Sequence, residues 1–232
     1  MKTPLILLLA TLPSLAAAQG FEGSVVDLQY QKYNRGDGQK IDSLEGTFDA
    51  ATSFGMLGAQ VGLSLGKEVD SSDDISFDQY NGLALHLTAD AGDNLRLGAM
   101  ALVDNRTSGV AFYAAEALYL GGPLRIEGRI GDSLETEDYS ILEAKGSYAF
   151  GSAFTARAGY HDTDRGAGGG YRVLSVGAGY QVNDGLELYA DVGRHKTDLG
   201  AAGSSKGSVI DLGVRFNLGG DSSRMFSFQP LN

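Results

Sequence analysis

An alternation of apolar and polar residues through the last third of the chain constrains its fold most strongly. In Val209–Leu218, apolar side chains occupy every second position, and polar residues or glycine lie between them. Successive Cβ atoms of a β-strand point to opposite faces, so this period predicts a strand with one apolar and one polar face. Tyr171–Val182 and Leu186–Gly193 repeat the pattern, and Asn183-Asp184-Gly185 between them is typical of a tight hairpin turn.

The same period recurs along the whole chain after its first residues. The predicted strands are Gly23–Tyr33, Lys40–Ala50, Gly55–Leu65, Gln79–Ala89, Leu95–Val103, Val110–Leu120, Leu124–Gly131, Tyr139–Phe150, Phe154–His161, Tyr171–Val182, Leu186–Gly193 and Val209–Leu218. Very short turns join the second strand to the third, the fourth to the fifth, the sixth to the seventh, the eighth to the ninth and the tenth to the eleventh. The remaining connections are longer and more polar. This sorting of loops is typical of an outer-membrane barrel, with the short turns on the periplasmic side.

We therefore predict an all-β fold: a single antiparallel up-and-down transmembrane β-barrel of about twelve strands over residues 19–218. Such a barrel has a backbone diameter of roughly 24 Å, between side-chain-filled small barrels and open porins. A soluble two-sheet sandwich also alternates, but it would not sort its loops so regularly. A C-terminal tail, residues 219–232, follows the predicted barrel.

The first residues predict export. Met1-Lys2-Thr3 is a short basic region, and an apolar stretch follows that ends in Ala16-Ala17-Ala18. This order is typical of a cleaved secretory signal peptide, predicted over residues 1–18. The alternative of a membrane-anchor helix is disfavoured, because the apolar run is short and contains two prolines.

Composition narrows the function classes. The net charge of −11 argues against a nucleic-acid partner, since phosphate binding needs a basic surface. The absence of cysteine excludes disulfides and thiolate chemistry. A barrel of this kind has a mean hydropathy near zero because half of each strand faces a polar lumen.

If the apolar face meets lipid, the opposite face lines the lumen. On that face the predicted basic wall contains Arg96, Arg125, Arg129, Lys145 and Arg157, and the predicted acidic wall contains Asp27, Glu45, Asp49, Glu187, Asp191 and Asp211. Walls of opposite sign on opposite arcs would select small charged solutes, as rings of charged side chains do in channels. The alternative interpretation is that inward charges pair across strands and fill the barrel.

Aromatic residues towards the strand ends indicate girdles at the two membrane interfaces. The predicted girdle residues are Tyr30, Phe48, Phe54, Tyr80, Tyr119, Tyr148, Phe150, Phe154, Tyr160, Tyr180 and Phe216. Ordinary strand propensity also enriches tyrosine and phenylalanine, which is the alternative explanation.

Catalytic motifs are missing. The chain has three histidines and no Gly-x-Ser-x-Gly elbow, so we predict that it is not an enzyme and uses no cofactor. His161, Asp162 and Asp164 are a weak metal-site candidate, with a solvated loop as the alternative. The acidic stretches 67–74 and 132–138 could bind divalent cations that bridge to lipopolysaccharide, or simply be solvated. Expected partners are outer-membrane lipid or lipopolysaccharide and small solutes, with the oligomeric state open.

Segments such as Tyr148–Tyr160, Asn183–Asp191 and Asp211–Phe216 resemble the Gram-negative porin-like outer-membrane barrels, especially the small alphaproteobacterial porin type. The resemblance implies an outer-membrane passive channel for small hydrophilic solutes or ions. A non-conducting structural or surface-interaction barrel is the alternative, and a lipid-modifying enzyme is disfavoured. Family members usually end on an aromatic residue in the last strand. Here the chain continues, so the tail is either a periplasmic extension or supplies Phe226 and Phe228 to the assembly signal.

Overall fold

A computed structural model describes most of the chain. The described residues are 20–34, 40–70, 77–105, 111–134, 139–164, 166, 169–198, 200 and 203–227. The predicted signal peptide, parts of both acidic stretches and the tail from residue 228 onward lie outside them. Within the described part, no helix is long and apolar enough to cross a membrane.

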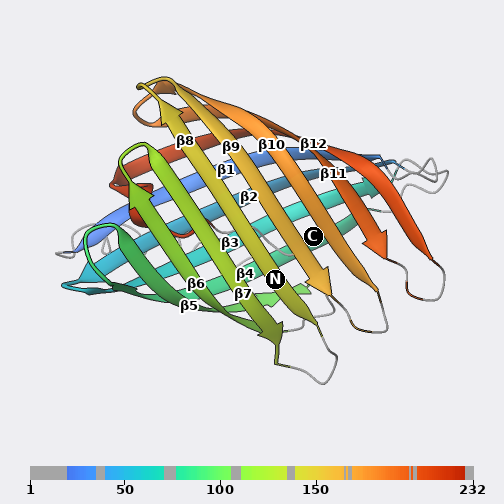
Figure 1. Cartoon of the computed structure of the whole chain (residues 1–232), viewed down its shortest axis with the longest axis horizontal. Coiled ribbons are helices and arrows are strands. Elements are labelled where there is room, and N and C mark those ends of the chain that lie inside the picture. The colour runs from blue at the N-terminus through green and yellow to red at the C-terminus, as the bar shows by residue number, and fades with distance from the viewer. Residues whose placement is uncertain are drawn as a thin grey trace.

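Twelve antiparallel strands form one closed barrel, as predicted (Figure 1). They are β1 (Phe21–Asn34), β2 (Lys40–Phe54), β3 (Leu57–Asp70), β4 (Phe77–Asp90), β5 (Leu95–Asp104), β6 (Ala111–Gly121), β7 (Leu124–Ser133), β8 (Ser140–Phe150), β9 (Phe154–Asp164), β10 (Gly170–Asn183), β11 (Leu186–Asp198) and β12 (Ser204–Gly220). Each strand pairs with its neighbours in sequence, and β1 pairs with β12 from Gly23↔Gly220 to Asn34↔Ser208. The closing seam leaves no free sheet edge, so every strand has a partner on both sides.

The connections alternate in length as predicted. Five turns of two to four residues lie at one end of the barrel, where β1 begins and β12 ends, and connections of five or six residues lie at the other end. The two-residue turn between β6 and β7 contains Gly122 at φ 59°, a left-handed conformation that glycine adopts without strain. At the predicted hairpin turn between β10 and β11, the Asn183 carboxamide oxygen accepts a hydrogen bond from the Gly185 N–H at 2.9 Å.

The strands are longer than predicted at the end with the longer connections. β3 continues to Asp70, β11 continues to Asp198, and β12 already begins at Ser204. In these extensions both faces of the strand carry polar residues, so the apolar alternation that marks a strand in the sequence is absent. A strand of about 9–11 residues is enough to cross the apolar layer of a bilayer. The 17 residues of β12 therefore extend beyond that layer.

The two faces of the barrel differ sharply in exposure. Outward-facing leucines such as Leu44 and Leu87 are 63% and 71% exposed, whereas most inward-facing charged and polar residues are buried.

Most of the predicted aromatic girdle residues are on the outward face, but the prediction was wrong for Tyr80. Its side chain is 4% exposed and points inward, because it shares a face with buried Ala84 rather than with exposed Leu83, and its hydroxyl donates to Glu45 at 2.9 Å.

One side of the barrel interior is apolar, which was not predicted. The cluster comprises Ala84, Met100, Leu102, Phe112, Ala114, Tyr139 and Ile141, from β4 to β8. The rings of Phe112 and Tyr139 meet edge to face with centroids 4.8 Å apart. β5 and β6 therefore carry apolar residues on both faces, one packed against the interior and one exposed.

A glycine in β12 makes room for an inward-facing tyrosine. A Cβ built on Gly213 would lie 2.1 Å from the Tyr189 ring, which rests on the Gly213 backbone across the β11–β12 pair. In this position the Tyr189 hydroxyl donates to the Asp27 carboxylate of β1 at 2.7 Å. Glycine at this position thus lets one aromatic ring tie three strands together.

We predict that Gly213→Ala destabilises the barrel by about 1–3 kcal/mol, the usual cost of overpacking. The added methyl group must push the Tyr189 ring off the wall and break its bond to Asp27. Gly128→Ala is the matched control, because the nearest atom to its new Cβ would be 3.9 Å away. The measurement is the temperature at which the folded band is lost in unboiled gel electrophoresis. Equal midpoints for the two variants would contradict the prediction.

Candidate functional site

The structure directs all of the predicted lumen residues to the inside of the barrel. Arg96, Arg125, Arg129, Lys145 and Arg157 come from β5, β7, β8 and β9, and Asp27, Glu45, Asp49, Glu187, Asp191 and Asp211 come from β1, β2, β11 and β12. The alternation of the strands is sufficient to produce this arrangement, because each of these residues lies one position away from residues that face outward. The candidate site is therefore the lumen itself.

Arg129 is the centre of the charge network on the β6–β8 wall. Its guanidinium donates to Glu116 on β6 at 2.8 Å and to Glu143 on β8 at 3.1 Å. Glu143 also pairs with Lys145, and Glu127 accepts from Arg125 at 3.0 Å. Arg129, Glu116 and Glu143 are almost completely buried. Buried charges are stable only when they are paired, and here carboxylates satisfy the buried cation from both neighbouring strands.

Arg96 forms a bridge across the lumen near the end with the short turns. It donates to both carboxylate oxygens of Glu22 at 2.6 Å and to Asp90 at 2.8 Å. Glu22 lies on β1 and Arg96 on β5, which are four strands apart in the barrel. An ion pair between such distant strands requires a narrow lumen at this level.

The opposite wall carries a second network around Arg215 of β12. Arg215 donates to Asp27 at 2.8 and 3.0 Å and to Glu187 at 3.5 Å. Next to it, Arg157 of β9 lies 4.1 Å over the Tyr189 ring and pairs with Asp191 at 3.4 Å. The arginines of this wall thus offset only part of its acidic character.

The inward charges do not form one purely basic and one purely acidic wall. Arg125, Arg129 and Lys145 are neutralised locally by Glu127 and Glu143, which are interleaved on the same strands. Arg157, predicted as part of the basic wall, pairs with Asp191 of the predicted acidic wall. Local pairing of inward charges therefore accounts for these contacts: Arg129 pairs across strands, as the alternative interpretation expected, whereas Arg125 and Lys145 pair with carboxylates two positions away on their own strands. Carboxylates still outnumber cations on the inner face of β1, β2, β11 and β12, as predicted for the acidic wall.

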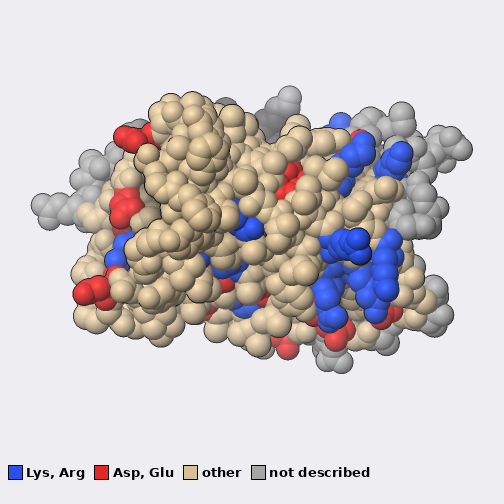
Figure 2. All heavy atoms as spheres, turned by 45° about the horizontal axis from the view of Figure 1, so that its top comes forward, with Lys and Arg blue, Asp and Glu red and all other residues tan. Residues whose placement is uncertain are grey.

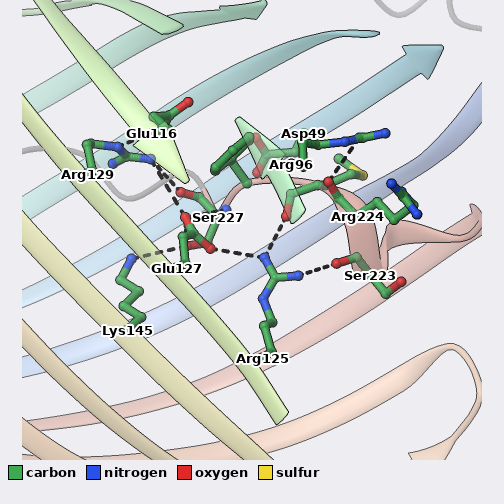
Figure 3. Close-up of polar contacts among 12 residues, drawn as sticks. Asp49, Arg96, Glu116, Arg125, Glu127, Arg129, Lys145, Ser223, Arg224 and Ser227 are labelled. Atoms are coloured by element: carbon green, nitrogen blue, oxygen red, sulfur yellow. Dashed lines mark hydrogen bonds and ion pairs between the residues drawn. The ribbon is translucent and has the colours of Figure 1, made fainter. Parts of the chain in front are cut away.

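The first residues of the C-terminal tail cross the lumen, which was not predicted. β12 ends at Gly220, and residues 221–227 then turn into the barrel towards the β3–β8 side. Five consecutive backbone carbonyls of this segment accept hydrogen bonds from inward-facing side chains. The pairs are Arg125 with Ser223 and Met225, Arg96 with Arg224, Gln60 with Phe226, and Arg129 with Ser227 (Figure 3).

Side chains of the segment are also engaged. Ser227 donates from both its N–H and its hydroxyl group to Glu127, each at 2.9 Å, and Lys145 donates to the Ser227 hydroxyl at 3.2 Å. Arg224 pairs with Asp90 at 2.7 Å. The segment therefore binds both the cations and the carboxylates of the β4–β8 side.

Phe226 anchors the segment. It is 1% exposed, and its ring stacks on His86 with an interplanar angle of 6°. The Gln60 carboxamide donates to the Phe226 carbonyl at 2.7 Å and accepts from the Phe226 N–H at 2.9 Å. Gly98 leaves the space that the ring occupies, since a Cβ there would be 3.0 Å from Phe226. The structure thus puts Phe226 inside the barrel, where neither interpretation of the tail expected it.

Sequence reasoning missed this segment because nothing in its composition marks a strand or a helix. The available signal was Met225-Phe226, two adjacent large apolar residues directly after the polar stretch Asp221–Arg224. Residues of this kind need burial, and the lumen is the nearest place that offers it.

Aromatic rings and histidines line the lumen towards the end with the longer connections. Tyr33, Tyr171 and His195 meet with centroids 5.8 to 6.2 Å apart, and His161 lies 6.3 Å from Tyr171. Strand alternation separates His161 from Asp162, which points outward and pairs with Arg172 at 2.7 Å. Within the described residues, no group of three or more His, Asp or Glu side chains could hold a metal ion.

We predict that Arg129→Met strongly destabilises the barrel, by about 3–5 kcal/mol, because it leaves two buried carboxylates without their shared cation. Lys32→Gln is the control. It breaks a half-exposed pair with Asp42 at 3.7 Å, and such pairs contribute about 0–1 kcal/mol. Urea unfolding followed by tyrosine fluorescence measures both variants. A stability loss for Arg129→Met no larger than that of the control would show that the network does not support the fold.

Comparisons with known proteins identify the fold. No protein-family model matches the chain, and no curated protein matches it. Among solved structures, it is similar to the COG4313 outer membrane channel from Pseudomonas putida F1, with a TM-score of 0.62, 15% identity and coverage of 87% of this chain and 96% of that one.

Two further structures have the same fold. The CymD monoaromatic hydrocarbon channel has a TM-score of 0.59 at 10% identity, covering 86% of this chain and 90% of that one. The NanC porin has a TM-score of 0.57 at 11% identity, covering 82% of this chain and all of that one. At these identities the likeness is one of fold, and the fold is that of outer-membrane β-barrel channels.

Proposed function

We propose that this chain is a porin-like passive channel of the bacterial outer membrane for small hydrophilic solutes or ions, of the small alphaproteobacterial porin type. The observation that carries the proposal is a closed twelve-stranded barrel with an exposed apolar outer face and a charged inner face. Burying charges inside a barrel is costly unless the lumen is hydrated or the charges are paired. The likeness in fold to outer-membrane channels supports the same function.

The solvent-accessible charges mark the path that we propose for solutes. Four inward-facing cations keep part of their side chains exposed: Arg125 at 28%, Lys145 at 27%, Arg157 at 23% and Arg215 at 31%. They lie on β7, β8, β9 and β12. The tail segment and the apolar cluster occupy the β3–β8 side of the lumen, and the tail contacts Arg125 and Lys145. The proposed path therefore runs beside the tail along β8–β12, from Lys145 past Arg157 and Arg215 to the carboxylates of β11 and β12.

The tail segment supports a narrow channel. It enters from the end with the short turns, which is the periplasmic end in outer-membrane barrels. There it occupies the part of the lumen beside the Arg96–Glu22 bridge. The same observation favours the second candidate, a non-conducting structural barrel, if the segment closes the remaining space. Electrical recording separates the two candidates.

We predict that the refolded protein inserted in a planar bilayer gives discrete conductance steps. Lys145→Glu should then shift the ion preference towards cations, since it reverses a charge on the proposed path. Lys67→Glu is the matched control, because Lys67 is exposed on the outer face of β3 and should leave the preference unchanged. Reversal potentials in a salt gradient measure the preference. The channel proposal fails if folded protein gives no steps.

We predict that removing residues 221–232 increases the single-channel conductance severalfold, because it clears the periplasmic half of the lumen. Phe226→Ala, which keeps the chain length, should increase it less and raise the rate of flickering between levels. The gain in conductance would separate a channel narrowed by its tail from a barrel that is closed throughout. An unchanged conductance in both variants would contradict the tail's role, and the Phe226→Ala variant remains informative if the truncated chain fails to assemble.

A further inference from the structure

A group of cations lies on the outside of the barrel at the end with the longer connections. Figure 2 shows Lys and Arg side chains gathered at one end of the face that it draws. The group on β10–β12, called here the outer basic cluster, consists of Arg172, Arg194, Lys196 and Lys206. All four are exposed and occur in a chain whose net charge is −11.

The strand register brings these cations together. Lys196 pairs directly with Arg172 on one side and with Lys206 on the other. Arg194 is two residues from Lys196 on the same face of β11. Directly opposed side chains on adjacent strands have Cβ atoms about 4.5–5.5 Å apart, and like charges at that distance are destabilising. The sheet therefore holds a row of three cations at a cost in stability.

The cations are only partly neutralised by the protein. Arg172 bonds to Asp162 at 2.7 and 3.0 Å. In the part of the chain that the structure describes, Arg194, Lys196 and Lys206 have no carboxylate within ion-pair distance, whereas Lys32 on the adjoining β1 is paired with Asp42. Three neighbouring cations on one outward face are thus available to an external anion.

The surface next to the cluster is apolar and exposed. Continuing along the same faces towards the middle of the barrel, β10 presents Leu174 and Val176, β11 presents Val192, and β12 presents Ile210 and Leu212, which are 44% to 62% exposed. The cluster lies beyond this apolar band, at the strand ends with the longer connections, where a bilayer places its headgroups. An occupant that fits both surfaces is an amphiphile with acyl chains and more than one negative charge in its headgroup.

We propose that the outer basic cluster binds the phosphorylated headgroup of lipopolysaccharide, with the acyl chains lying along the apolar band of β10–β12. The assignment rests on the proposed outer-membrane location. In that membrane the end with the longer connections faces outward, and the lipid there carries phosphates on an acylated sugar headgroup. Guanidinium and ammonium groups are suited to phosphate, because each charge-assisted hydrogen bond is short and strong. The cluster offers several such donors on a rigid sheet, and bound phosphates would relieve the repulsion in the row.

The test measures lipid binding to the folded full-length barrel in a neutral detergent by native mass spectrometry. The probes are purified lipopolysaccharide that carries both lipid A phosphates, the same lipid after enzymatic dephosphorylation, and phosphatidylglycerol. The expected result is one stoichiometric adduct with the phosphorylated lipopolysaccharide and affinity at least about tenfold lower for the other two lipids. The triple variant Arg194→Gln, Lys196→Gln, Lys206→Gln should lose affinity by a similar factor.

Two controls match the triple variant. Lys67→Gln removes one outward lysine away from the cluster on β3 and should bind as the native chain does. Lys196→Arg with Lys206→Arg keeps the charges and should keep the binding. The triple variant removes like-charge neighbours, so it is expected to fold, and Lys196→Gln alone gives a second measurement if it does not.

Equal binding of native and triple-variant barrels, or of phosphorylated and dephosphorylated lipopolysaccharide, would overturn the proposal. Equal binding of phosphatidylglycerol would replace it with a general site for anionic lipids. Conductance of the same preparations is measured separately. Because lipid binding needs only the folded barrel, a failure of the channel proposal leaves this result unchanged, and a failure of lipid binding leaves the conductance unchanged.

Discussion

Pairing of every backbone amide is the constraint on which the rest of this structure depends. Apolar surroundings offer no water to an unpaired N–H or C=O group, so a spanning sheet must close on itself. Here the closure is made by β1 and β12, which pair over most of their length. Once the sheet is closed, each strand has one face outside and one inside, and the period of two decides which side chains are exposed to which medium. The apolar outer surface and the charged interior both follow from this single condition.

Sequence reasoning recovered what depends on that period. The number of strands, their order, the short turns and the inward direction of residues such as Arg129 and Asp211 follow from alternation and turn chemistry alone. It failed where alternation is lost. The ends of β11 and β12 are polar on both faces, and β5 and β6 are apolar on both faces, so the period carries no information about their length or their inner surface. The apolar runs in β5 and β6 were visible in the sequence, as is typical of strands buried on both faces.

The contacts within the lumen could not be predicted because they depend on register and side-chain reach. Arg129 meets Glu116 and Glu143 because the β6–β7 and β7–β8 registers put the three residues in one row. A shift in either register would separate Arg129 from one of these two carboxylates. Desolvation of a charge costs more than long-range attraction between separate walls returns, so local pairing dominates the interior. The tail adds to this local pairing. Its backbone carbonyls accept hydrogen bonds from the guanidinium groups of Arg96, Arg125 and Arg129, which have more N–H donors than their carboxylate partners use.

The two groups of cations in this barrel differ in how their charge is compensated. Inside the barrel, Arg96, Arg125 and Arg129 are each held by a carboxylate and by a backbone carbonyl of the tail. Outside, beyond the apolar band, Lys196 and Lys206 face each other across two strands at a cost that no protein group in the described chain offsets. An arrangement of the first kind stabilises the fold by itself. The second kind is stable only to the extent that solvent or an anionic partner compensates it, so the outer cations are better explained by what binds to the barrel than by what holds it together.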